Sequence, residues 1–236
     1  MFILLVTVLS IHFASAAQQL HYVGFNTLNS KDKTNSRIIF DNYLHQLAPI
    51  MLKYDMNLQI FDVSYGGSDK LTADVITVGS VRDMETFQAF FADPQLQKIL
   101  PLLDKALGQH EVIFTSQSIA KTEDDDRHTL LSLFWLKGDN DQLADAQKSI
   151  ASSINSIKPI FHKYEVSLLH STQGIMSNKG LGDEYEETKP PHHIELWTMG
   201  DAHGFLEDPK VLDSGKMTEQ FRDRTENFWV KMRTSL

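Results

Sequence analysis

The sequence contains no cysteine, so it has neither disulfides nor a thiol nucleophile. It also lacks an Asn-x-Ser/Thr glycosylation sequon, a glycine-rich phosphate loop and a Gly-x-Ser-x-Gly sequence. Basic residues are few: 22 Lys and Arg stand against 31 Asp and Glu, for a net charge of −9. This balance argues against nucleic acid or an anionic membrane surface as the main partner, because both require a basic footprint. A chain without disulfides must be held together by its hydrophobic core.

Charge is also absent from the first 17 residues, where an apolar run leads into the small residues ASAA. This pattern predicts a secretory signal peptide over residues 1–17, cut near Ala16 or Ala17. An uncleaved anchor is the alternative, although the run is shorter than the ~20 apolar residues that a membrane span needs. We therefore expect a secreted or periplasmic protein with no membrane contact after cleavage.

Two phrases of the sequence occur twice. LAPIMLKYDMNL at residues 47–58 matches IKPIFHKYEVSL at 157–168, an offset of 110 (49 to 159). FFADPQLQKIL at 90–100 matches FLEDPKVLDSG at 205–215, an offset of 115 (90 to 205). We expect a first repeat over residues 18–121, an acidic linker over 122–127 and a second repeat over 128–236.

Each repeat has the same predicted order of elements. In the first, a strand at 22–28 precedes a helix from about Ser36, strands at 58–64 and 74–81, a helix capped by Asp83 and broken at Asp93-Pro94, and a strand at 110–116. In the second, the first helix is expected to continue through Pro159 to Tyr164. The order βαββαβ is that of the ferredoxin-like unit, whose sheet carries helices on one face only. The predicted fold is α+β: two tandem ferredoxin-like repeats whose bare sheet faces enclose an intramolecular pseudo-dimeric α/β barrel.

Residues 73–114, with Phe-Phe-x-Asp-Pro followed by Ile-Leu-Pro-Leu and a closing strand, resemble the dimeric α/β-barrel superfamily. The resemblance is closest to its small domains of unknown function, with antibiotic-biosynthesis monooxygenase-like and stress-responsive barrel domains as wider relatives. It covers residues 56–115 well and the second repeat in pattern only. The superfamily includes cofactor-free monooxygenases, isomerases, aldoxime dehydratases, haem-degrading enzymes and chlorite dismutases. The matched residues cap and pack a helix, so no catalytic residue is carried over.

The strands of the second repeat carry the candidate site. His170 lies on one strand and His193 and Glu195 on the next, where they share a face and could form an acid–base pair or a metal site. Trp135 and Trp197 are expected to wall an apolar pocket between the sheets. The alternatives are that the histidines lie at a solvated strand entrance and that the tryptophans only pack the core. The long connection at residues 174–191 is expected to cover the barrel mouth.

The predicted function is binding of a small apolar or aromatic ligand or substrate, with no cofactor. One hypothesis is a cofactor-independent enzyme of monooxygenase, isomerase or lyase type, and another is a non-catalytic binding or stress protein. A haem- or metal-binding barrel is a weaker alternative, and a homo-oligomer is left open. A pocket with a buried, polar-paired histidine would favour the enzyme, and a wholly apolar pocket would favour the binder.

Overall fold

The computed structural model describes residues 19–120, 127–138, 140–181 and 184–233. The predicted signal peptide and residues 122–126 of the acidic linker lie outside this part of the chain, so export stays a prediction. None of the helices that are described is long and apolar enough to cross a membrane.

Both repeats form the predicted βαββαβ units. The elements of the first are β1 (Leu20–Leu28), α2 (Lys33–Lys53), β2 (Asn57–Gly66), β3 (Val75–Val81), α3 (Met84–Phe91), α4 (Pro94–Ala106) and β4 (Leu107–Thr115). Those of the second are β5 (His128–Leu136), α5 (Asn140–Ile157), two 3-10 turns (Lys158–Ile160 and His162–Tyr164), β6 (Ser167–Thr172), β9 (His193–Met199), α6 (Ala202–Glu207), α7 (Pro209–Glu219) and β10 (Arg222–Met232). An additional hairpin, β7 (Gly174–Leu181) and β8 (Glu184–Thr188), is inserted into the second unit.

The strands form one antiparallel sheet in the order β6-β9-β5-β10-β2-β3-β1-β4-β7-β8. The two units join where the second part of β2 leaves β3 and pairs with β10. They join again where β7, separated from β6 only by Gln173, pairs with β4. Because β6 continues into β7, the two ends of the row belong to one run of chain and the sheet closes into a barrel.

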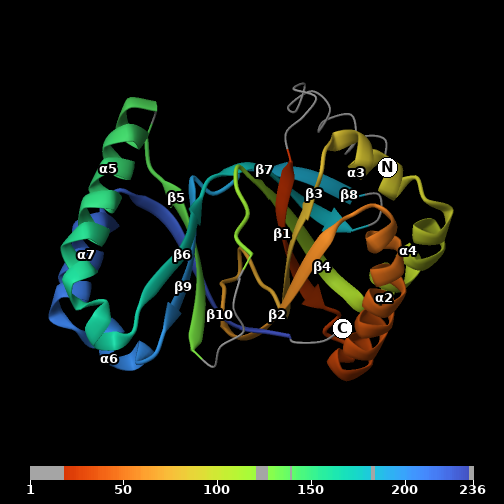
Figure 1. Cartoon of the computed structure of the whole chain (residues 1–236), viewed down its shortest axis with the longest axis horizontal. Coiled ribbons are helices and arrows are strands. Elements are labelled where there is room, and N and C mark those ends of the chain that lie inside the picture. Colours follow the sequence, from red (N-terminus) through yellow and green to blue (C-terminus); the bar gives the residue numbers. More distant parts are fainter. Residues whose placement is uncertain (1–18, 121–126, 139, 182–183, 234–236) are drawn as a thin grey trace.

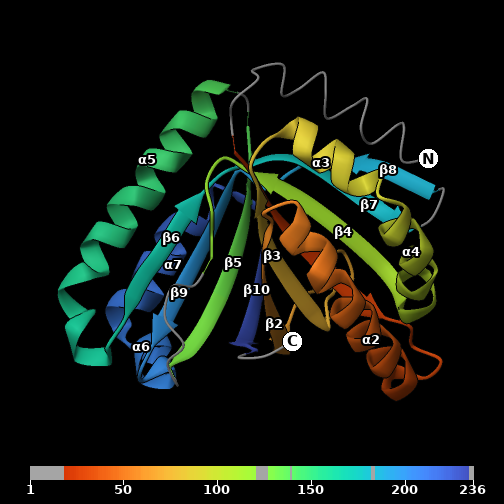
Figure 2. The ribbon, with the colours of Figure 1, turned by 45° about the vertical axis from the view of Figure 1, so that its right-hand side comes forward.

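The barrel lies between two layers of helices. Helices α2, α3 and α4 cover the outer face of the first unit, and α5, α6 and α7 cover that of the second (Figures 1 and 2). Alternate residues of each strand therefore face either a helix layer or the barrel interior. On β1, for example, Val23 and Phe25 point inward, while Leu20 and Leu28 face the helices.

Apolar side chains from both units fill the barrel interior. Phe25 of β1 and Phe228 of β10 pack there with ring centroids 5.3 Å apart, and both side chains are buried. Trp135 belongs to the same cluster. The interior is therefore a hydrophobic core that joins the two repeats. The sequence predicted a pocket at this place.

Three local expectations differ from the structure. Helix α2 begins earlier than predicted, because the side chain of Asp32, and not of Ser36, accepts the capping hydrogen bond from the Asn35 amide. Pro49 lies inside α2, but its counterpart Pro159 lies in a 3-10 turn, because α5 ends at Ile157 and does not continue to Tyr164 as predicted. The connection at 174–191 contains β7 and β8, because the edge of β4 offers unpaired backbone groups that a further strand can satisfy.

The repeated phrase Lys-Tyr-acid has a structural explanation in the first unit. At the end of α2, the Tyr54 hydroxyl donates to Asp93 Oδ2 at 3.0 Å, and Lys53 Nζ lies 2.6 Å from the same oxygen. Asp93 in turn caps α4 by accepting from the Gln95 amide. These contacts fasten the end of α2 to the beginning of α4.

The second unit repeats this arrangement, which we call the helix clasp. The Tyr164 hydroxyl donates to Asp208 Oδ2 at 2.8 Å, and Asp208 caps α7 through the Lys210 amide. The acid after each tyrosine, Asp55 or Glu165, has a positive φ of 51° or 52°. Since the repeated residues form the same clasp twice, their repetition has a structural explanation.

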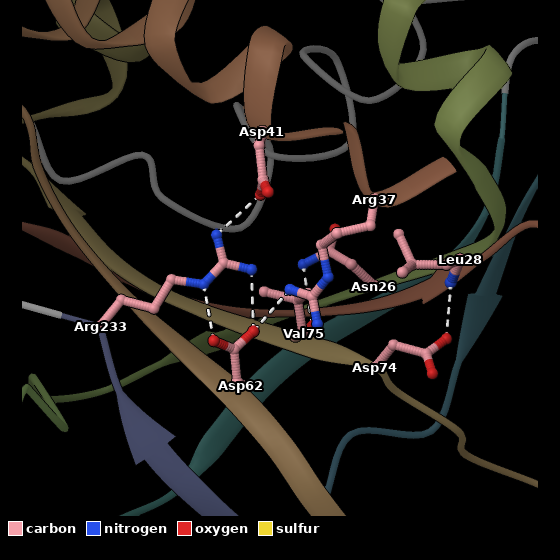
Figure 3. Close-up of polar contacts among 8 residues, drawn as sticks. All are labelled: Asn26, Leu28, Arg37, Asp41, Asp62, Asp74, Val75 and Arg233. Carbon is pink, nitrogen blue, oxygen red and sulfur yellow. Dashed lines mark hydrogen bonds and ion pairs between the residues drawn. The ribbon is translucent and has the colours of Figure 1, made fainter. Parts of the chain in front are cut away.

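Polar contacts also join the two units. Arg233, directly after β10, donates from Nε and Nη2 to the two carboxylate oxygens of Asp62 on β2, both at 2.8 Å. Its Nη1 bonds Asp41 of α2 at 2.8 Å, and Arg37 also contacts Asp62 (Figure 3). The end of the second repeat is thereby fixed to a strand and a helix of the first.

Candidate functional site

A cavity of about 190 Å³ lies between the sheet and the helices of the first unit. Its walls are mainly apolar and aromatic side chains of α2, α3 and α4. Its sheet-side floor carries the polar groups of Tyr22, Asn26, Thr77 and His110. These four residues come from β1, β3 and β4, which are adjacent in the sheet. The cavity thus combines an apolar helical wall with a small polar floor, the usual composition of a small-molecule site.

Two glycines within strands, Gly24 and Gly79, help to shape this floor. A Cβ on Gly79 would lie 2.3 Å from Tyr22 Cζ, so the tyrosine ring can lie across β3 only because residue 79 has no side chain. A Cβ on Gly24 would lie 2.5 Å from Thr77 Oγ1. Glycine inside a strand often marks such a close approach.

The second unit has larger side chains at the equivalent positions. In the first unit, Gly24 of β1 pairs with Thr77 of β3. The corresponding pair in the second unit is Ser132 of β5 with Glu195 of β9. The strand register also places Trp197 where the first unit has Gly79. The ring of Trp197 packs there against Phe161 at 5.7 Å between centroids. The indole therefore occupies the layer that is hollow in the first unit.

Hydrogen bonds on the floor fix the orientation of His110. Asn26 Nδ2 is placed to donate to the carbonyl oxygens of Val75 and Gly24, at 3.2 and 3.3 Å. Asn26 Oδ1 therefore faces His110 Nδ1, 2.8 Å away, and can only accept. Nδ1 must then carry the proton, which leaves Nε2 with a free lone pair. Among the described residues, Nε2 has no hydrogen-bond partner.

Burial keeps both ionisable groups of the floor neutral. Desolvation lowers the pKa of His110 to about 4, and it raises the pKa of Tyr22 well above its usual value. Both side chains are surrounded by protein but keep some accessible surface, as expected of groups that face a cavity. At neutral pH, the cavity therefore presents an uncharged imidazole acceptor and an uncharged phenol.

The structure brings three of the five predicted site residues together on the outer, helix-covered face of the second unit. Glu195, with 3% of its surface exposed, accepts hydrogen bonds from Trp197 Nε1 at 2.8 Å and pairs with His193 Nε2 at 2.9 Å. Ser171 Oγ lies 3.1 Å from the same imidazole nitrogen. The polar atoms of this cluster bond one another, and the helix layer covers the indole of Trp197.

The other two predicted residues lie elsewhere. Trp135 points into the barrel interior, where its Nε1 donates to the Lys189 carbonyl at 2.8 Å. It is therefore on the opposite face of the sheet from Trp197. His170 lies next to a bulge in β6, opposite Leu196, and within the described part of the chain it forms no hydrogen bond or ion pair with His193 or Glu195. The bulge breaks the strict alternation on which the predicted grouping depended.

A haem or metal site, which the resemblance left open, does not fit this geometry. In the ranges that the structure describes, no three His, Asp or Glu side chains are grouped to hold an ion. The cavity, at about 190 Å³, is smaller than the roughly 300–1,000 Å³ of pockets for drug-sized ligands and cofactors. We therefore derive no chemistry through either group.

Sequence reasoning missed His110, Asn26 and Tyr22. His110 stood at the start of a predicted strand and gave no motif, and its partner Asn26 is 84 positions earlier. The available signal was the pair of glycines inside apolar strands, Gly24 and Gly79, because glycine in a strand interior indicates that another group approaches the backbone closely. Nothing in the sequence showed that Tyr22 was that group.

Solved structures of the same architecture match nearly the whole chain. A variant of chlorite dismutase from Candidatus Nitrospira defluvii is 10% identical, with a TM-score of 0.52 and coverage of 93% of this chain and 93% of that chain. An anthrone oxidase-like protein is 9% identical, with a TM-score of 0.49 and coverage of 93% and 94%. Neither a protein-family profile nor a curated protein sequence matches the chain. The chain has the fold of the dimeric α/β-barrel proteins, with both ferredoxin-like units in one polypeptide.

Proposed function

We propose that this is an exported barrel protein that binds a small, mainly apolar compound in the cavity of its first repeat. The observation that carries the proposal is the cavity itself, with an apolar helical wall and a polar floor. Its volume of about 190 Å³ is close to that of an engineered apolar cavity of about 150 Å³ in another protein, which binds benzene. A compound of about one ring therefore matches its size.

The cost of an empty cavity supports a ligand. Protein interiors contain few voids larger than a water molecule. At about 24 cal/mol per Å³, an enclosed and empty void of this volume would cost roughly 4–5 kcal/mol. A larger side chain at the floor would remove that cost, as Trp197 does in the second unit. A ligand that fills the cavity would offset this free-energy cost.

A pair of leucine variants tests this proposal with toluene as the probe. Leu103 lines the cavity, whereas the neighbouring Leu102 on the same helix does not. Leu103→Phe should fill the space and weaken toluene binding at least tenfold in isothermal titration calorimetry. Leu102→Phe, the matched control, should bind as the unmodified protein does. If toluene fails to bind the unmodified protein, or if both variants bind it equally well, the proposed site is wrong.

Catalysis is a second candidate, and the pairing of His110 with Asn26 favours it. A buried imidazole held in one tautomer by a second residue resembles a general base with its orienting partner. Against it stands the pKa of about 4, which makes His110 a weak base at neutral pH. Mass spectrometry of the probe recovered after incubation in air separates the two candidates, because a binder returns it unchanged.

Export is supported by the uncharged, apolar residues 2–9 and by the small residues that follow them. N-terminal sequencing of the mature protein should begin at Ala17 or Gln18. Recovery of soluble protein that still begins at Met1 would contradict export without affecting the cavity.

A further inference from the structure

We propose that the cavity selects an un-ionised ligand that carries a hydrogen-bond donor, and that the donor bonds to His110 Nε2. The simplest ligand of this class that matches the cavity is a one-ring alcohol or phenol. This inference rests on the proposed function, because it names the ligand class for the same cavity.

The hydrogen-bonding pattern of the floor supplies the acceptor. Asn26 Nδ2 is engaged by backbone carbonyls, so its Oδ1 holds the proton on His110 Nδ1 at 2.8 Å. The other nitrogen, Nε2, can then only accept. An acceptor that faces an apolar cavity without a partner is unfavourable, and a ligand hydroxyl would remove that cost. A purely apolar ligand would leave it in place.

The charges around the cavity exclude ionised ligands. No lysine or arginine of the described residues lines it, so a carboxylate would be buried without a counter-charge from them. Within the part of the lining that the structure describes, Asp104 is the one carboxylate, and its side chain is exposed to solvent. An ammonium group deep in the cavity would meet only neutral side chains on the floor. Transfer of either ion from water is therefore strongly unfavourable.

A ligand series tests the inference without any change to the protein. Phenol, anisole, toluene and benzoate have similar size, but only phenol is a neutral donor. We expect phenol to bind about 3- to 10-fold more tightly than toluene or anisole, the gain from one hydrogen bond. Benzoate should not bind measurably at neutral pH. In ¹⁵N NMR, phenol should shift the His110 Nε2 resonance, while toluene leaves it near its free position.

Two variants identify the acceptor. His110→Phe keeps a ring at this position but removes Nε2, so phenol should lose its advantage over toluene. Tyr22→Phe removes the phenolic hydroxyl of the floor, and phenol should keep most of its advantage over toluene. If Tyr22→Phe abolishes the preference and His110→Phe does not, the assignment to His110 is overturned.

The result also separates this inference from the proposed function. Toluene bound as tightly as phenol would overturn the ligand class but retain the cavity as a binding site. The same holds if benzoate binds well. If none of the four compounds binds, both the ligand class and the proposed function are overturned.

Discussion

At the scale of single residues, His110 supplies the proposed hydrogen-bond acceptor of the cavity, and the ionisation of its imidazole should control ligand binding. Burial lowers the pKa of its imidazole from 6.5 to about 4. The folded protein therefore holds this residue neutral at pH values where the unfolded chain protonates it. Its contribution to stability is present above about pH 6.5 and is lost as the pH falls towards 4, because the unfolded state then binds more protons.

The same shift predicts how phenol binding depends on pH. Affinity should be constant from pH 6 to 8 and should fall as the pH drops through about 4, because a protonated Nε2 cannot accept a hydrogen bond. Titration calorimetry at several pH values, with circular dichroism to confirm the fold, measures this profile. Toluene is the control and should show no such fall while the protein stays folded. A phenol affinity that falls already between pH 7 and 6 would mean that His110 is not held neutral.

At the scale of elements, the helix clasp explains why the chain repeats Lys-Tyr-acid at one offset and Asp-Pro at another. In each unit a tyrosine at the end of one helical segment bonds the aspartate that caps a later helix. The Lys53 and Tyr54 hydrogen bonds and the Gln95 amide hold the pKa of Asp93 at about 2. This contribution to stability is present above about pH 4 and is lost as the pH falls towards 2.

Removing the tyrosine hydroxyls tests the clasp. Tyr54→Phe and Tyr164→Phe should each lower the free energy of unfolding by about 0.5–1.5 kcal/mol, the net value of one hydrogen bond. The double variant should show nearly the sum, since the two clasps lie in different units and share no residue. Urea denaturation measures the changes. Tyr65→Phe, at a side chain with 77% of its surface exposed, is the control and should change stability by less than about 0.5 kcal/mol. A clasp variant as stable as this control would show that the contact contributes nothing.

At the scale of the whole molecule, the two repeats depend on each other. The interior core takes side chains from both units, and the contacts of Arg233 with Asp62 and Asp41 fix the end of the second unit to the first. Arg233 has 18% of its side chain exposed and bonds Asp62 through two nitrogens. Such a two-point contact holds a definite geometry better than a single surface ion pair does.

Arg233→Ala should therefore destabilise the protein by about 1–2 kcal/mol, because it removes hydrogen bonds to two carboxylates that are partly buried. Arg82→Ala is the matched control. Arg82 also bonds a carboxylate, that of Asp83, and the Thr86 hydroxyl, but its side chain is 73% exposed, so its loss should destabilise the protein much less than the loss of Arg233. Thermal unfolding monitored by circular dichroism gives both values. Equal effects of the two substitutions would show that Arg233 does not fasten the units together.

The sequence by itself determined the doubled βαββαβ order, the closed pseudo-dimeric barrel, the helix cap at Asp83 and the helix break at Asp93-Pro94. These features follow from local periodicity, capping residues and the internal repeat, all of which can be read directly from the amino-acid sequence. Only the tertiary structure decided where the space is. Strand alternation could place His193, Glu195 and Trp197 on one face, but not show that the indole fills that layer. The cavity depends on Gly24 and Gly79 lying beside Tyr22, Thr77 and His110, residues separated by up to 88 positions (22 to 110). The volume of a cavity depends on how completely the side chains that face one another fill the space between them. These side chains meet only after folding, so no pattern along the chain predicts the volume.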